Sequence, residues 1–148
     1  RVNFHNIGVQ EPYIGWEVSG AGLYFSDCFT WGASLFTDAT YKGGSAMFHI
    51  GPNTATNGVS IVNCSFDPSG ANPAIQSKFQ YSVWIEDVDG LWMANCHVAG
   101  AYLAHMKINP GQSYGLGGIY MTNVWFDYYA QRCVDIGASK TSSTGSWT

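Results

Sequence analysis

The chain has 148 residues, of which 11% are charged, 16% are aromatic and 18 are glycines. Charged residues make up roughly 25% of an ordinary globular domain, so this composition argues against a helical protein with charged faces and favours a β-rich fold. The net charge is −4 with only six Lys and Arg, which argues against nucleic-acid binding because that requires a basic patch. No uninterrupted run of about 18 apolar residues occurs, so we predict no membrane insertion.

The first predicted element is the nonapeptide RVNFHNIGV at residues 1–9, which recurs along the chain with the same pattern. The copies are GLYFSDCFT (22–30), GVSIVNCSF (58–66), GLWMANCHV (90–98) and GIYMTNVWF (118–126). An aliphatic residue is second in each copy, an apolar residue is fourth, and Asn or Asp is sixth. A constant unit with connectors of variable length is typical of a solenoid, in which each repeat forms one coil.

Each copy is predicted to form two short strands joined by a one-residue corner. Its apolar residues alternate with other residues at the period of a strand. The Asn or Asp interrupts this alternation, and these residue types adopt left-handed backbone more readily than other non-glycine residues. The seventh position then points inward, so we expect one inward column of Ile7, Cys28, Cys64, Cys96 and Val124.

The cysteines in this column are interpreted as small hydrophobic residues, because Ile and Val take the same position in other copies. The CxxC and CxxH spacings of zinc sites are absent from the chain, so we predict no metal site and no cofactor. Cys133 belongs to a different predicted strand and is expected to be another buried thiol.

A third alternating segment accompanies most copies, at residues 14–18, 47–50, 83–86, 106–108 and 133–136. Three short strands per coil, one tight corner and two variable loops predict an all-β fold, a right-handed parallel β-helix of about five coils. We assign residues 1–136 to the coils and 137–148 to a connector, and we expect the chain to be a segment of a longer polypeptide.

The pattern resembles the pectate-lyase-like superfamily of parallel β-helices. Irregular repeat lengths, low charge and abundant Gly, Ser, Asn and aromatic residues make it most similar to a bacteriophage tailspike or tail fibre protein. That resemblance implies a homotrimer in the virion tail, or alternatively a secreted, extracellular protein, that binds a bacterial surface polysaccharide and often cleaves it. The Asn-Thr-Asp, Asp-Asp, Gly-His-Gly and Arg-Ile-Lys signatures of polygalacturonases are absent, so a pectinase-like enzyme or a polysaccharide lyase is a weaker alternative.

The outward residues of the third strands are the first candidate site, with Glu17, His49, Glu86, Lys107 and Asp135 predicted to lie one per coil. Two coils would separate Glu17 from Glu86 by about 10 Å, close to the roughly 6.5 to 9.5 Å between acid and base in an inverting glycosidase. Our hypothesis is a glycoside hydrolase with Glu17, Glu86 and Asp135 as catalytic residues and with His49, Trp84 and Lys107 in contact with substrate. The alternative is a solvated β-face, because charges of alternating sign repel one another little.

Aromatic residues on the connectors are the second set of candidates, since exposed rings on a rigid scaffold can stack on the apolar faces of sugars. They are Trp31, Tyr41, Tyr81 and Tyr128. Packing against a neighbouring subunit is an alternative role for these rings. His5 and His97 are expected to point outward with no partner carboxylate. Three interpretations therefore stay open, namely a depolymerising glycosidase, a non-catalytic glycan-binding adhesin and a structural segment of a fibre.

Overall fold

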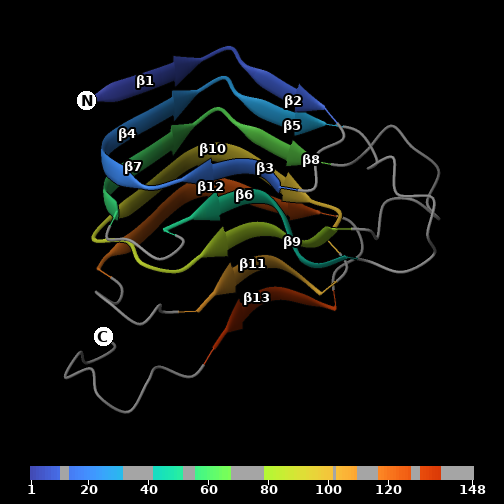
Figure 1. Cartoon of the computed structure of the whole chain (residues 1–148). Coiled ribbons are helices and arrows are strands. Elements are labelled where there is room, and N and C mark those ends of the chain that lie inside the picture. Colours follow the sequence, from blue (N-terminus) through green and yellow to red (C-terminus); the bar gives the residue numbers. More distant parts are fainter. Residues whose placement is uncertain are drawn as a thin grey trace.

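The structure is a computed structural model in which β-strands stack into coils, with β1 and β2 at one end and β13 at the other (Figure 1). It describes residues 1–10, 14–31, 42–51, 56–67, 79–101, 103–109, 117–127 and 131–137. In this part of the chain every regular element is a strand, and no helix is long and apolar enough to cross a bilayer.

The larger sheet contains the five copies of the nonapeptide. Its first row consists of β1 (Val2–His5), β4 (Gly20–Ser26), β7 (Thr56–Val62), β10 (Leu91–Ala99) and β12 (Ile119–Asp127). Beyond the corner lie β2 (Gly8–Gln10), β5 (Phe29–Trp31), β8 (Ser65–Asp67) and the second halves of β10 and β12. All pairings are parallel and align the copies residue by residue. The predicted repeat is confirmed.

The smaller sheet receives one strand from each coil. Its members are β3 (Ile14–Val18), β6 (Lys42–Ile50), β9 (Phe79–Ile85), β11 (Ala104–Ile108) and β13 (Arg132–Ile136). They pair in parallel in chain order. Two all-parallel sheets supplied alternately by successive coils make a parallel β-helix, as predicted. The predicted connector, except for Gly137, lies outside the described residues.

The corners between the two rows of the larger sheet form a ladder of side chains. Their residues are Asn6, Asp27, Asn63, Asn95 and Asn123, with φ between 52° and 54°. The amide of Asn63 donates to the Asp27 carboxylate at 3.3 Å, Asn95 donates to Asn63 at 3.3 Å, and Asn123 donates to Asn95 at 2.9 Å. Each amide therefore donates to the coil before it, which gives the ladder a single direction. The predicted left-handed corners are confirmed.

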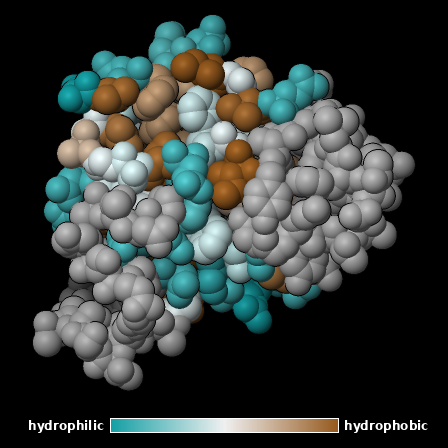
Figure 2. All heavy atoms as spheres, viewed as in Figure 1, coloured by the Kyte–Doolittle hydropathy of each residue, from teal (hydrophilic) through white to brown (hydrophobic). Residues whose placement is uncertain are grey.

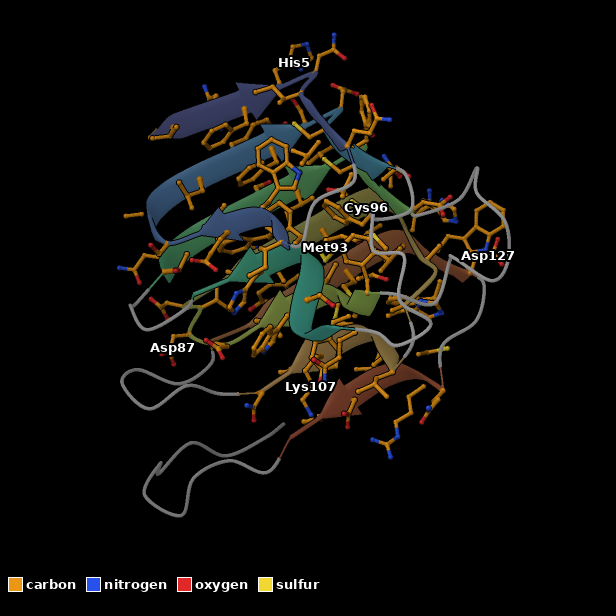
Figure 3. All side chains as sticks on the ribbon, turned by 45° about the vertical axis from the view of Figure 1, so that its right-hand side comes forward. His5, Asp87, Met93, Cys96, Lys107 and Asp127 are labelled. Carbon is orange, nitrogen blue, oxygen red and sulfur yellow. The ribbon has the colours of Figure 1, made fainter. Side chains whose placement is uncertain are left out.

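The core lies between the two sheets and consists of inward columns that run along the stack. Aromatic rings pack in contact, with centroids 4.6 Å apart for Phe4 and Phe25, 4.9 Å for Phe25 and Phe48, and 5.0 Å for Phe48 and Phe66. Met93 and Cys96 lie inside the stack, whereas Lys107 and Asp127 lie at its periphery (Figure 3).

The cysteine column behaves as predicted. Cys28, Cys64 and Cys96 are buried, and all four cysteines of the chain are free. Burial raises the pKa of the Cys64 thiol to about 12 and also raises that of Cys96. The expectation for Cys133 is wrong, because this thiol is exposed. It lies on β13, which pairs with β11 alone among the described strands.

Candidate functional site

One row of outward residues crosses the smaller sheet, as the sequence predicts, but one member differs. The register aligns Glu17, His49, Trp84, Lys107 and Asp135. Trp84 rather than Glu86 takes the third place, because Ile85 pairs with Ile50 in the inward column and the outward residue is the one before it. Glu86 follows the end of β9 and approaches the row from the adjoining loop.

The imidazole of His49 joins the two predicted catalytic glutamates. Its Nδ1 lies 3.5 Å from Glu17 Oε2 and its Nε2 lies 3.5 Å from Glu86 Oε2. The ring is buried and stacks on the Trp84 indole with centroids 4.1 Å apart and planes 12° apart. Four predicted site residues, Glu17, His49, Trp84 and Glu86, therefore form one cluster, and the imidazole occupies the space between the two carboxylates.

The two carboxylates of this cluster differ in exposure, and burial changes the pKa of the less exposed one. Glu17 is 54% exposed in its side chain, compared with 20% for Glu86. Burial raises the pKa of Glu86 above its ordinary value of 4.5, and attraction to His49 offsets part of this rise. Glu86 thus keeps its proton to a higher pH than an ordinary glutamate does.

Lys107 and Asp135 form a separate ion pair at the far end of the row. The Lys107 ammonium donates to Asp135 Oδ2 at 2.8 Å, and the Arg132 guanidinium lies 3.2 Å from Oδ1. The hydrogen bond from Lys107, helped by Arg132, lowers the pKa of Asp135. An acid with a lowered pKa stays ionised, so Asp135 is poorly suited to donating a proton.

The predicted connector aromatics are located only in part. Tyr81 was expected on a loop, but it lies in β9 and packs, buried, against Ala46 and Ala104, with its ring 5.6 Å from that of Trp84. That expectation is wrong because β9 already begins at Phe79. Trp31 ends β5, and its side chain lies outside the described part of the molecule. Tyr41 and Tyr128 also lie outside the described residues.

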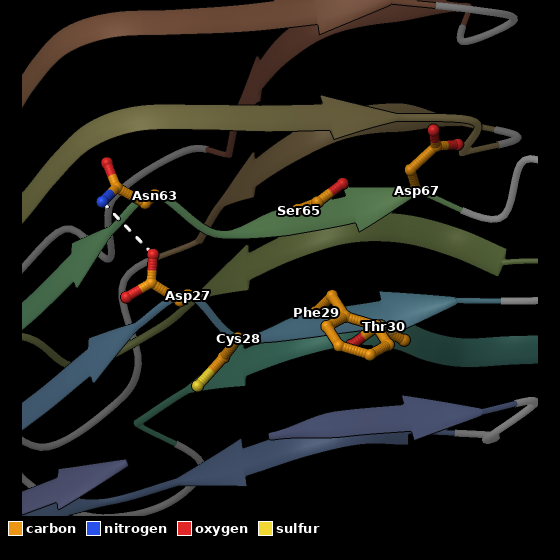
Figure 4. A pocket seen from close by; sticks show the side chains of 7 residues that line it. All are labelled: Asp27, Cys28, Phe29, Thr30, Asn63, Ser65 and Asp67. Carbon is orange, nitrogen blue, oxygen red and sulfur yellow. Dashed lines mark hydrogen bonds between the residues drawn. The ribbon is translucent and has the colours of Figure 1, made fainter. Parts of the chain in front are cut away.

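A groove that sequence reasoning missed lies over β5 and β8, just beyond the corner ladder (Figure 4). Its volume is about 420 Å³. The lining residues are Asp27, Cys28, Phe29, Thr30, Asn63, Ser65 and Asp67. The Phe29 ring is 43% exposed and covers Gly8 of the first coil, where an added Cβ would collide with it. An apolar ring therefore lies among carboxylate, amide and hydroxyl groups in one open depression.

The outward column that runs through this groove continues along the stack. It contains Gly8, Phe29, Ser65, His97 and Trp125, which take the eighth position of the five nonapeptides. His97 lies 5.3 Å from the exposed Trp125 ring. We call this row the eighth-position column. It could have been predicted by aligning the eighth residues of the five nonapeptides.

Carboxylates flank both histidines of the larger sheet, contrary to expectation. His97 Nδ1 lies 3.5 Å from Asp67 Oδ2, and its Nε2 lies 3.9 Å from Asp127 Oδ2. Similarly, His5 Nδ1 lies 3.3 Å from Asp27 Oδ2. Asp67 and Asp127 each directly follow the ninth residue of a neighbouring nonapeptide, and Asp27 takes the position after that of His5. Comparison of equivalent positions therefore did not reveal these pairs.

A second outward column lies on the other side of the corner ladder. Trp92 and Tyr120, at the third position of their nonapeptides, are exposed and stack with centroids 5.7 Å apart and planes 10° apart. An added Cβ at Gly90 would meet the Trp92 ring, as one at Gly118 would meet the Tyr120 ring. Glycine at the first position thus makes room for the aromatic ring at the third.

Within the described residues, no group of three or more His, Cys, Asp or Glu could hold a metal ion. No protein-family model, curated protein or solved structure matches this chain.

Proposed function

We propose that this chain is a carbohydrate-binding parallel β-helix, similar to phage tailspikes and tail fibres of the pectate-lyase-like type, that binds a bacterial surface polysaccharide. In this proposal it acts in a virion tail or as a secreted protein, as part of a homotrimer. The observation that carries the proposal is the groove over β5 and β8, with its exposed Phe29 ring among polar side chains. Sugars combine an apolar face of C–H bonds with many hydroxyl groups, and such a surface offers a partner to each.

The shape of the surrounding sheet also fits an extended chain of sugars. The eighth-position column carries Phe29, Ser65, His97 and Trp125 on successive strands, which lie about 4.8 Å apart. A polysaccharide lying along the stack would meet an aromatic ring at each end and hydrogen-bonding groups between them.

Charge selects the class of polysaccharide. Asp27 and Asp67 line the groove, and neither Lys nor Arg is among the described residues that line it. A polyuronate would place its carboxylates beside these two aspartates, which costs free energy. A neutral glycan, or one rich in amino sugars, is the ligand class that we propose.

Binding can be tested with a glycan array followed by calorimetry on the glycan that binds. We expect Phe29→Ala to weaken binding about tenfold, which corresponds to about 1.4 kcal/mol. Trp92→Ala is the matched control, because it also removes an exposed ring, but one outside the groove. Unchanged binding by Phe29→Ala together with loss in Trp92→Ala would contradict the groove and move the site to the other column.

Hydrolysis is a second candidate function, favoured by the raised pKa of Glu86. An acid that keeps its proton can protonate the leaving-group oxygen of a glycosidic bond, while the exposed Glu17 would serve as the partner carboxylate. His49 would have to move from between them for a sugar to enter. Lys107 and Asp135 would then extend the substrate contacts along the row.

Release of reducing ends from the bound glycan tests this second function. We expect Glu86→Gln and Glu17→Gln each to lower the rate at least 100-fold, the order of a lost acid or base, with the nearby Asp89→Asn as control. Because Glu86 must carry its proton, activity should fall as the pH rises through its raised pKa. If the wild type binds glycan but releases no reducing ends, the interpretation as a non-catalytic adhesin is correct. If it binds no glycan at all, the interpretation as a structural segment of a fibre is the one that is left.

A further inference from the structure

Charged side chains are sparse in this protein, so one titrating group can change the charge of a whole site. The chain has 10 Asp and Glu against six Lys and Arg. Hydrophobic and hydrophilic residues are interspersed over the described part of the face shown in Figure 2. In the groove over β5 and β8 the described charged residues of the lining are Asp27 and Asp67. The groups that face these two carboxylates therefore control the charge that a ligand meets in the groove.

The carboxylate of Asp67, which lines the groove at the end of β8, lies beside an imidazole from the next coil (Figure 4). His97 Nδ1 is 3.5 Å from Asp67 Oδ2, and the two side chains are 28% and 13% exposed. Because both groups are mostly withdrawn from water, solvent and salt screen their interaction less than they screen a pair at the surface. The charge on His97 therefore acts directly on a carboxylate of the groove.

A second carboxylate lies on the other side of the same imidazole. Asp127 Oδ2 is 3.9 Å from His97 Nε2, and this nitrogen is buried and makes no hydrogen bond within the described part of the chain. A neutral imidazole carries one N–H group, whereas an imidazolium carries an N–H on both nitrogens. Only the protonated ring of His97 can therefore present an N–H to both carboxylates at once.

Another imidazole that faces this cluster belongs to His105 on β11 and is 4% exposed. Burial lowers the pKa of the His105 imidazole, attraction to Asp127 offsets part of this effect, and repulsion from His97 adds to it. An ordinary imidazole changes its charge between about pH 5 and pH 8, and the lowered pKa keeps His105 neutral over more of that range. His105 is therefore poorly suited to changing the charge of the cluster near neutral pH.

We propose that protonation of His97 sets the charge class of the ligand that the groove accepts, acting through Asp67. When His97 is neutral, the negative charge of Asp67 is not offset by this ring, and the groove favours neutral or amino sugars. When His97 is protonated, its charge offsets that of Asp67, so acidic sugars are repelled less and amino sugars are attracted less. This inference rests on the proposed function for the nature of the ligand, but the charge of the groove can be measured without any ligand.

A cysteine placed in the groove measures this charge directly. Ser65 lines the groove and is the register partner of His97. The thiol of Ser65→Cys reports the local potential through its rates of reaction with an anionic and a cationic methanethiosulfonate reagent. The ratio of these two rates cancels the pH dependence of the thiol itself. Every protein compared also carries Cys133→Ser, which removes the exposed native thiol, and His5→Gln, which removes the imidazole 3.3 Å from Asp27 Oδ2.

We expect the ratio of the anionic to the cationic rate to rise about fivefold as the pH falls through the range in which imidazole titrates, the upper end for a partly exposed charge pair. Adding His97→Gln should leave the ratio independent of pH. A ratio that does not change in the protein that retains His97, or one that rises equally in His97→Gln, would overturn the proposal. Circular dichroism checks that His97→Gln is folded, and His97→Asn replaces it where it is not.

A glycan array read at low and at neutral pH separates this proposal from the proposed function. The protein that retains His97 should bind acidic glycans better at low pH than at neutral pH, whereas His97→Gln should show the same charge preference at both. If the rate ratio rises but no glycan binds at either pH, the proposed function is wrong and the control of the groove's charge by His97 stands. If glycan binds with an unchanged charge preference in the protein that retains His97, His97 does not select the ligand and the proposal is wrong.

Discussion

The middle and the ends of this β-helix are made from the same columns of residues, yet they differ in burial. Met93 and Met121 are register partners in one column, but Met93 is 1% exposed and Met121 is 43% exposed. The difference shows that the coils on either side of a residue decide its burial, because each coil contacts only its neighbours. Residue type and strand position are equal in this pair, so it isolates the effect of a neighbouring coil.

The largest expected effect is the difference between Met93→Ala and Met121→Ala. Removing a buried Met leaves a cavity and should lower the free energy of unfolding by about 2–5 kcal/mol, whereas the half-exposed Met121 should cost less than about 1 kcal/mol. Urea unfolding at low protein concentration measures both. Equal losses of unfolding free energy in the two variants would contradict the conclusion that neighbouring coils decide how deeply a residue is buried.

Substitutions in the corner ladder are expected to have a smaller effect on the free energy of unfolding. Asn95→Ala places alanine in left-handed backbone, which costs about 1–2 kcal/mol, and removes two ladder hydrogen bonds. Asn95→Gly removes the same bonds without the backbone cost, so we expect it to be less destabilising by about 1 kcal/mol. Asn123→Ala, in the last described coil, should lower the free energy of unfolding by less than Asn95→Ala does. The Asn123 side chain makes one described ladder bond, whereas that of Asn95 makes two. If Asn95→Gly were as costly as Asn95→Ala, the left-handed corner would not be the source of the cost.

The smallest expected effect is a difference in reactivity between thiols, which is measured without any change in stability. In the native protein we expect an aromatic disulfide reagent to react rapidly with Cys133 alone, because the other three thiols are buried and burial raises the pKa values of Cys64 and Cys96. Unfolding in urea should make all four cysteines react. Cys133→Ser is the control and should abolish the rapid phase. Rapid reaction of a second thiol would show that the middle coils open readily.

The repeat and the corner residues could be predicted because they are local in sequence. Alternation of apolar residues and one left-handed Asn or Asp act within a single nonapeptide, and five copies of that unit reveal the columns. The site was harder to predict. Its first candidates include Glu17, His49 and Glu86, which do come together. Glu86 was assigned to the row in place of Trp84 because the two residues have the same parity in the predicted strand, whereas β9 ends at Ile85. Phe29, Asp67 and His97 were missed because they meet across coils.

By itself, the amino-acid sequence determined the class of fold, the inward columns and the position of the Asn or Asp corner in each nonapeptide. Only the tertiary structure decided which members of a column are buried, that His49 lies between two glutamates, and that a groove with Phe29 opens beside the corner ladder. The physical reason is that strand period and left-handed corners follow from neighbours along the chain. Burial, ion pairs and grooves depend on residues 20 to 40 positions away, and the connectors of variable length set how those residues align.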